Sequence, residues 1–175
     1  MLFIAAGGPG DLVAAGILAR QRITESTFAT FLWERSARAA GPIRITSVYG
    51  LDRDRLGMRA TPQTQIAGSR TQLSDIAQLL SGETYVLDAD NLEGAQTSLS
   101  RLLASDDDGR IAVVDAGGDV LGQRDHDGLR SPLLEATTLS ILSDMGALPV
   151  SEVVVVGPGL DNELTVTEID SRRPH

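Results

Sequence analysis

The sequence predicts a single α/β domain of three layers, built around a mainly parallel, Rossmann-like sheet. Short apolar runs alternate with segments of helical periodicity, which is the pattern of α/β proteins. The chain has 175 residues, 42% of them hydrophobic and 22% charged, which suits one globular domain with a buried core. We therefore expect one domain over residues 1–170, followed by a flexible C-terminal tail at 171–175.

The first elements are predicted from apolar runs and from the turn residues between them. Leu12, Ile17 and Leu18 fall at helical spacing, and Asp11 before them suits an N-cap. Glycine and proline interrupt the polar stretch after the third apolar run. The predicted elements are strands at Leu2–Ala6, Thr27–Leu32 and Ile43–Val48, a helix at Asp11–Arg22, and an irregular, loop-rich segment at Asp52–Ser69.

The alternation continues in the second half. Gly82 marks the end of one helix, and Ser131 followed by Pro132 is a favourable start for another, with Ser131 as N-cap. The acidic stretch Ser105–Gly109 lacks the ligand spacing of a calcium loop, so we interpret it as a solvated turn. The predicted elements are helices at Gln72–Leu80, Leu92–Ala104 and Pro132–Met145, and strands at Thr84–Leu87, Ile111–Val114 and Val153–Val156.

Composition excludes several kinds of chemistry. All 15 basic residues are Arg, so lysine Schiff bases and lysine-containing phosphate loops are excluded. The chain has no Cys, and its two histidines are His126 and His175, so thiolate, iron–sulfur and His-rich metal sites are not expected. The net charge of −9 argues against nucleic acid and anionic membranes as partners. Because no targeting signal or membrane span is evident, we expect a cytoplasmic protein.

Candidate site residues follow three of the predicted strands. Parallel strands place their carboxyl ends at one edge of the sheet, where α/β proteins bind ligands. Carboxylates at this edge can act as general bases, hold an ammonium group or bind Mg²⁺, while glycine lets backbone N–H groups approach a ligand. The candidates are the acidic residues Asp11, Asp115, Asp119, Asp161 and Glu163, and the glycines Gly7, Gly8, Gly10, Gly117 and Gly118.

Structural roles compete with these functional ones. Glycine-rich turns are common in α/β proteins, and Asp115 alone can simply brace a loop. The first loop also lacks the dinucleotide fingerprint, because Val13 stands where the third glycine is needed. Asp115 and Asp119 flanking two glycines are harder to explain structurally, so we expect them on one rim of a pocket close to the GGPGD loop.

Cationic candidates lie in two other segments. Trp33 and Arg35 follow the second predicted strand, and Arg130 and Ser131 precede a predicted helix. An Arg beside the free N–H groups of a helix start can hold an anion, although a surface ion pair with a neighbouring Asp is the competing interpretation. His126, between two aspartates, would suit a proton shuttle if they contact it, but an exposed loop histidine is the commoner case.

The ordered motifs GGPGD, WER, VDAGGD, LRSPLLEATTL and GPGLDNEL resemble those of an uncharacterised α/β domain family of archaea and bacteria. The resemblance spans nearly the whole chain. Pro9 replaces a glycine of the first loop, and the chain stops soon after GPGLDNEL, where family members continue for roughly another half. We therefore expect a second half supplied by a separate polypeptide, or lost.

Such a shortened copy is similar to one subunit of the two-subunit enzymes of azinomycin-type and vazabitide-type biosynthesis. That resemblance implies closure of an aziridine with loss of sulfate, on a small anionic amino-acid-derived substrate that an amino-group carrier protein could present. A carboxylate among Asp11, Asp115 and Asp119 would be the base, and Arg35 or Arg130 with loop N–H groups would hold the departing anion. No cofactor, resident metal, nucleic acid or membrane is expected.

Two other hypotheses remain open. The chain could be a non-catalytic subunit that stabilises a partner enzyme, with structural carboxylates. It could also be a hydrolase or phosphotransferase that uses the acidic loops and Mg²⁺. Three activity measurements would distinguish these hypotheses from the aziridine-forming one. They use the isolated chain, the chain with its partner, and either sample with or without EDTA.

Overall fold

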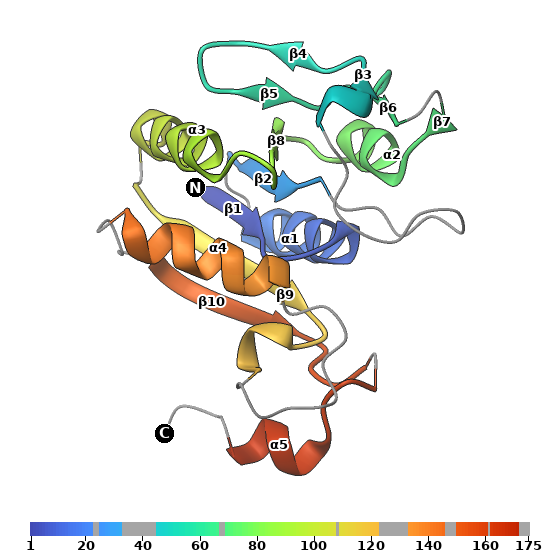
Figure 1. The fold of residues 1–175 in the computed structure, drawn as a ribbon. Helices are drawn as coiled ribbons and strands as arrows, with labels where there is room; N and C mark the ends of the chain where they lie inside the picture. Colours follow the sequence, from blue (N-terminus) through green and yellow to red (C-terminus); the bar gives the residue numbers. More distant parts are fainter. Residues whose placement is uncertain are drawn as a thin grey trace.

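The centre of the molecule is a seven-stranded sheet in the order β10-β9-β1-β2-β8-β5-β4. The structure, a computed structural model, describes residues 1–22, 25–32, 45–66, 69–107, 109–122, 133–145, 150–160 and 162–171. The parallel strands lie side by side in Figure 1 and are β1 (Leu2–Ala5), β2 (Thr27–Phe31), β8 (Thr84–Leu87), β9 (Ile111–Ala116) and β10 (Val150–Val156). The hairpin of β4 (Asp52–Arg53) and β5 (Met58–Arg59) adds to β8 in antiparallel fashion.

Helices cover both faces of this sheet, which confirms the three-layer α/β prediction. In Figure 1, α3 (Leu92–Ser105) and α4 (Leu133–Asp144) lie on the near face, with α1 (Pro9–Arg22) behind the sheet. Phe3 packs into the core on the side of α1 and α2 (Gln72–Leu79), whereas Ile4 packs into the core on the side of α3 and α4. Burial on both faces explains why the central parallel strands are continuous apolar runs.

The parallel arrangement of β1, β9 and β10 was expected and is confirmed by their registers. Leu2 pairs with Ile111, and Val153 pairs with Val113. These three strands therefore present their carboxyl ends, and the loops that follow, at the same edge of the sheet.

Two local predictions are wrong, and a third is incomplete. Asp11 is not an N-cap, because α1 begins at Pro9 and places Asp11 inside its first turn. Within the predicted strand Ile43–Val48, residues Ile45–Ser47 form a 3₁₀ turn, and the strand β3 covers only Val48–Tyr49. The stretch Asp52–Ser69 is loop-rich as predicted, but it also contains the two-residue strands β4, β5 and β6 (Gln65–Ile66), and β7 (Ser69–Arg70) begins at its last residue.

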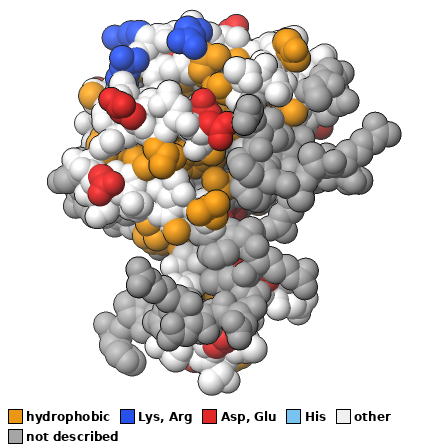
Figure 2. Space-filling view, in the orientation of Figure 1, with side chains coloured by type: hydrophobic (Ala, Val, Ile, Leu, Met, Phe, Trp, Pro, Cys, Tyr) orange, Lys and Arg blue, Asp and Glu red, His pale blue; other side chains and the backbone are white. Residues whose placement is uncertain are grey.

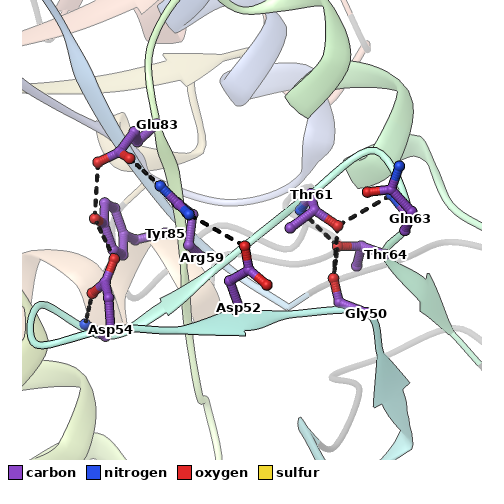
Figure 3. A network of polar contacts seen from close by, with 10 residues as sticks. Gly50, Asp52, Asp54, Arg59, Thr61, Gln63, Thr64, Glu83 and Tyr85 are labelled. Carbon is purple, nitrogen blue, oxygen red and sulfur yellow. Dashed lines mark hydrogen bonds and ion pairs between the residues drawn. The ribbon is translucent and has the colours of Figure 1, made fainter.

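The β4–β5 hairpin is held to the sheet by side chains that are far apart in the sequence (Figure 3). The Tyr85 hydroxyl donates to Asp54 Oδ2 at 2.9 Å and lies 3.0 Å from Glu83 Oε2. Arg59 pairs with Glu83 and, at 3.2 Å, with Asp52. Burial and these carboxylates raise the pKa of Tyr85, so its hydroxyl stays protonated and keeps donating.

Two smaller parts complete the described chain. A three-stranded sheet is formed by β3, β6 and β7. The helix α5 (Val166–Ser171) includes Ser171, the first residue of the predicted C-terminal tail. None of the helices in the described ranges is long and apolar enough to cross a membrane.

Candidate functional site

Three loops meet at the carboxyl edge of the sheet. The Ala116 N–H, at the end of β9, donates to Asp11 Oδ1 at 2.9 Å and so joins β9 to the start of α1. The Gly117 N–H donates to the Val156 carbonyl at 3.1 Å, and the Gly159 N–H donates to the Gly117 carbonyl at 2.6 Å. The loops after β1, β9 and β10 are therefore physically connected.

Asp11 is a buried carboxylate in the first turn of α1, with only 5% of its surface exposed. Its Oδ2 accepts a hydrogen bond of 2.5 Å from the Gly7 N–H, and its Oδ1 accepts the one from Ala116. Both oxygens are thus fixed by backbone donors. The first turn of a helix also favours a negative charge, because free N–H groups point toward it.

Asp115 lies on β9 itself, not in the loop after it, because β9 continues through Ala116. It is 1% exposed, and its Oδ2 accepts a hydrogen bond from the Val120 N–H at 2.9 Å. A position within a central strand fixes the direction of this carboxylate more firmly than a loop would.

Glu135 is the third buried carboxylate, and it comes from the first turn of α4. It is 6% exposed, and its Oε2 is buried with no hydrogen-bond partner among the described residues. One turn further along the helix, the buried Thr138 hydroxyl donates to the Ala6 carbonyl at 2.9 Å. That bond ties α4 to the end of β1 and keeps Glu135 over the first loop.

The three carboxylates form one cluster. One oxygen from each of Asp11, Asp115 and Glu135 can be chosen such that all three lie within 4.8 Å of one another. Burial, which disfavours the charged form, raises the pKa of Asp11 to about 7 and that of Glu135 to about 8. The negative charges of Asp115 and Asp119 raise both pKa values further. Near neutral pH, Asp11 and Glu135 can therefore each gain or lose a proton.

Gly7 is the glycine that this arrangement requires. A Cβ atom at Gly7 would lie 1.9 Å from Glu135 Oε1 and 2.9 Å from Asp11 Oδ2, so any side chain there would displace the carboxylates. Gly8 follows it in the same loop, and its carbonyl accepts the Asp11 N–H at 3.1 Å. Gly10, by contrast, lies in α1 with open space around it.

The second glycine loop turns through left-handed backbone, which suits glycine. Gly117 has φ of +121° and Gly118 has φ of +115°. Asp119 follows them as the first residue of a 3₁₀ turn and is half-buried, with its charge acting on Asp11 and Glu135. The structure therefore brings Asp119 near the cluster.

The remaining candidates are Glu163, which the structure describes, and six residues that lie outside the described ranges. Glu163 is half-buried in the segment after β10. The candidates outside the described residues are Trp33, Arg35, Arg130, Ser131 and Asp161, together with His126.

Sequence reasoning placed Glu135 in a helix but missed it as a site residue. A signal was present in the helix periodicity. Thr138 lies three residues after Glu135, and Leu142 lies seven residues after it, so the three share one face of α4. All three are buried. A glutamate on the buried face of a helix, directed at a glycine loop, indicates a site.

A separate cavity of about 450 Å³ lies between α3 and the β4–β5 hairpin. Its lining includes Arg53 and Arg101 together with Asp54, Asp88 and Glu93, so both signs of charge are present. None of the three clustered carboxylates lines it. We place the candidate catalytic centre at the carboxylate cluster and not in this cavity, because the cluster brings three buried carboxylates together.

Comparison with known proteins identifies the family of the chain. Residues 2–173 match the family model described as "Protein of unknown function (DUF1152)". Searches of curated proteins and of solved structures found no significant match. Because the matched region covers almost every residue, the resemblance to an uncharacterised family is confirmed, and the chain belongs to the DUF1152 family of proteins of unknown function.

Proposed function

We propose that this chain is one subunit of an enzyme that closes an aziridine ring by intramolecular amine attack and expels sulfate. The observation that carries the enzymatic part is the cluster of Asp11, Asp115 and Glu135, whose carboxylate oxygens lie within 4.8 Å of one another at the carboxyl edge of the sheet. The choice of reaction rests on the resemblance of the chain to one subunit of the two-subunit aziridine-forming enzymes. A cluster of carboxylates suits this reaction, because its substrate brings an ammonium group that must lose a proton.

The carboxylates would provide the general base. Proton transfer is most efficient when the pKa of the base lies near the working pH, and the pKa values of about 7 for Asp11 and about 8 for Glu135 meet this condition. Glu135 Oε2 is the best acceptor, since no described group donates to it. The freed amine would then form the C–N bond while the C–O bond to sulfate breaks. A second carboxylate would accept the proton lost from the ring nitrogen.

The departing sulfate would need positive groups away from the carboxylates. The N–H groups of Gly7 and Gly117 are already used by Asp11 and by the Val156 carbonyl, so they are poor candidates for this role. In this proposal, Arg35 or Arg130 would therefore bind the departing sulfate, together with other loop N–H groups. An Arg fork matches the geometry of a sulfate oxyanion.

A second subunit would complete the enzyme. Exposed apolar side chains lie over the face that carries α3 and α4 in Figure 2, where Leu92 and Leu133 are exposed, and a second exposed apolar set, Val153 and Val156, lies on the edge strand β10. Exposed apolar surface beside a candidate site is typical of protein interfaces. The substrate itself would be a small anionic amino-acid derivative, free or on an amino-group carrier protein.

The test uses this chain co-expressed with its candidate partner and a substrate that carries a vicinal amine and sulfate ester. Sulfate release and the mass of the aziridine are measured. We expect Glu135→Gln to lower the rate by at least about 100-fold, the usual contribution of a general base. Asp119→Asn should lower the rate far more than it lowers the melting temperature, whereas Glu93→Gln, exposed on α3, serves as the matched control.

The same experiment separates the alternatives. Normal activity of Glu135→Gln and Asp119→Asn in the complex would contradict the proposal and favour a non-catalytic subunit. A second candidate function, hydrolysis or phosphoryl transfer with a divalent cation, is favoured by the same three oxygen ligands. Loss of phosphatase or phosphotransferase activity on adding EDTA, without any sulfate release, would support that function instead.

A further inference from the structure

We propose that Asp11, Asp115 and Glu135 together bind one divalent cation of the Mg²⁺ or Mn²⁺ type. The inference rests on the same site as the proposed function, but not on the reaction, because a cation bound by Asp11 and Glu135 would occupy the oxygens that act as bases there. It is carried by the positions of the three carboxylates, by a buried oxygen without a partner, and by the excess of negative charge.

The spacing suits a single ion. The three oxygens lie within 4.8 Å of one another, while ligands about 2.1 Å from Mg²⁺ in octahedral geometry are about 3–4 Å apart. Closing the difference needs only small rotations of the side chains. Because the three ligands leave about three of the six positions to water or substrate, the ion would be accessible for binding a second molecule.

Glu135 supplies the independent observation. The residue is 6% exposed, one of its carboxylate oxygens lies in the cluster, and its Oε2 makes no hydrogen bond in the part of the chain that the structure describes. A buried carboxylate oxygen without a partner is costly, because it loses its water and gains nothing in return. A cation between the three carboxylates would remove this cost.

The negative charges around the cluster also favour a bound cation. Within the described residues, the charges of Asp119, Asp11 and Asp115 act on Glu135, and these three are negative. The charges that act on Asp11 are also negative. The first turns of α1 and α4 add partial positive charge at this site. A divalent cation would reduce the formal charge of the three ligands from −3 to −1.

The ligands are also held in place before binding. Backbone N–H groups of Gly7 and Ala116 fix Asp11, and that of Val120 fixes Asp115. Such outer contacts orient the ligands and strengthen metal sites. Because the ligands are all oxygen and the chain has no Cys, a hard ion is preferred over zinc.

Binding is tested on the purified full chain, with its partner if that is needed for solubility, and without substrate. Mn²⁺ is titrated at pH 8.5 by calorimetry and followed by electron paramagnetic resonance, with Mg²⁺ as competitor. We expect one site per chain and a higher melting temperature with Mn²⁺. Glu135→Gln should weaken Mn²⁺ binding by at least about 10-fold, whereas Glu93→Gln, on the exposed side of α3, should not.

The outcomes for binding and for catalysis are distinct. Absence of Mn²⁺ binding at millimolar concentration, or equal binding by Glu135→Gln, would overturn the cation site. Aziridine formation that continues in EDTA, together with absent Mn²⁺ binding, would overturn it and leave the proposed function intact. Stoichiometric Mn²⁺ binding that Glu135→Gln weakens would support the site even if sulfate release is never observed.

Discussion

Asp11 and Glu135 are both buried carboxyls with raised pKa values, but their hydrogen bonds give them different roles. Asp11 accepts N–H groups at both oxygens, so it also holds the β1–α1 loop and the end of β9 together. Glu135 Oε2 has no such donor in the described chain. Stability should therefore depend on Asp11 through hydrogen bonding, and on Glu135 through its ionisation.

The ionisation of Glu135 predicts how stability changes with pH in EDTA. Its pKa rises from an ordinary 4.5 to about 8 in the folded protein, mainly through burial. Between these values the folded state binds more protons than the unfolded state, so the free energy of unfolding falls as pH increases through this window. Replacing Glu135 by Gln removes this titration. Its melting temperature should change less between pH 5.5 and 8.5 than that of the wild type.

Scanning calorimetry at several pH values measures this difference. Glu93→Gln, which lies exposed on α3, should show the same fall as the wild type. A residual fall in Glu135→Gln is expected, because the pKa of Asp11 is also raised, to about 7. An equal fall in Glu135→Gln and wild type would contradict the role given to Glu135.

Asp11→Asn should destabilise the protein most below about pH 7, because above this pKa the substitution also removes a buried charge, which offsets part of the loss. An amide can accept only one of the two N–H groups that Asp11 holds, and its NH₂ would face the other. Leaving one buried donor unsatisfied costs about 1–3 kcal/mol of unfolding free energy. The melting temperature should fall by roughly 2–4 °C for each kcal/mol. An unchanged melting temperature would show that these two hydrogen bonds contribute nothing to stability.

At the level of elements, the central strands were predictable from sequence because their burial on two faces makes them continuous apolar runs. The predicted Thr84–Leu87 matches β8, and Ile111–Val114 lies within β9. The β4–β5 hairpin was missed because each strand has two residues, both exposed in β4, and leaves no periodicity to detect. Its position depends on Tyr85 and Glu83, which are distant in sequence.

The candidate site was predictable to a similar degree. Asp11, Asp115 and Asp119 could be found because each follows or ends a predicted strand near glycine. Glu135 could not be placed there by that rule, since its proximity to Gly7 depends on how α4 packs on the sheet. The anchoring bond between Thr138 and the Ala6 carbonyl spans 132 residues, which local patterns do not report.

Tyr85→Phe tests what holds the hairpin. The substitution keeps the buried ring but removes the hydroxyl that contacts Asp54 and Glu83. Loss of these bonds should cost about 1–3 kcal/mol, because the partners are charged. Hydrogen exchange should become faster at the Gly57 and Leu56 amides, which Asp54 caps, while β1 and β9 keep their protection. Unchanged exchange in the hairpin would show that the backbone pairing of β5 with β8 is sufficient.

At the level of the whole molecule, we predict that the chain works in a hetero-oligomer. Among the described strands β10 is at the edge of the sheet, and its Val153 and Val156 are exposed. Leu160 and Val166, in the segment that follows, are 83% and 74% exposed. An apolar edge strand beside apolar side chains associates with other chains unless a partner covers it. Purified alone, the chain should self-associate or be inactive, and co-expression with its partner should restore solubility.

A charge placed on this surface tests the prediction, with sedimentation velocity as the measurement. Val153→Arg should weaken the complex by at least about 10-fold, because an interface of about 1,000 Å² or more would have to bury an unpaired cation. Leu79→Arg, at the exposed end of α2, is the matched control and should leave the complex intact. A homodimer through β10 would instead form without the partner and be disrupted by the same substitution. A stable, fully active monomer would contradict the prediction, since no partner would then be needed to cover β10 or to complete the site.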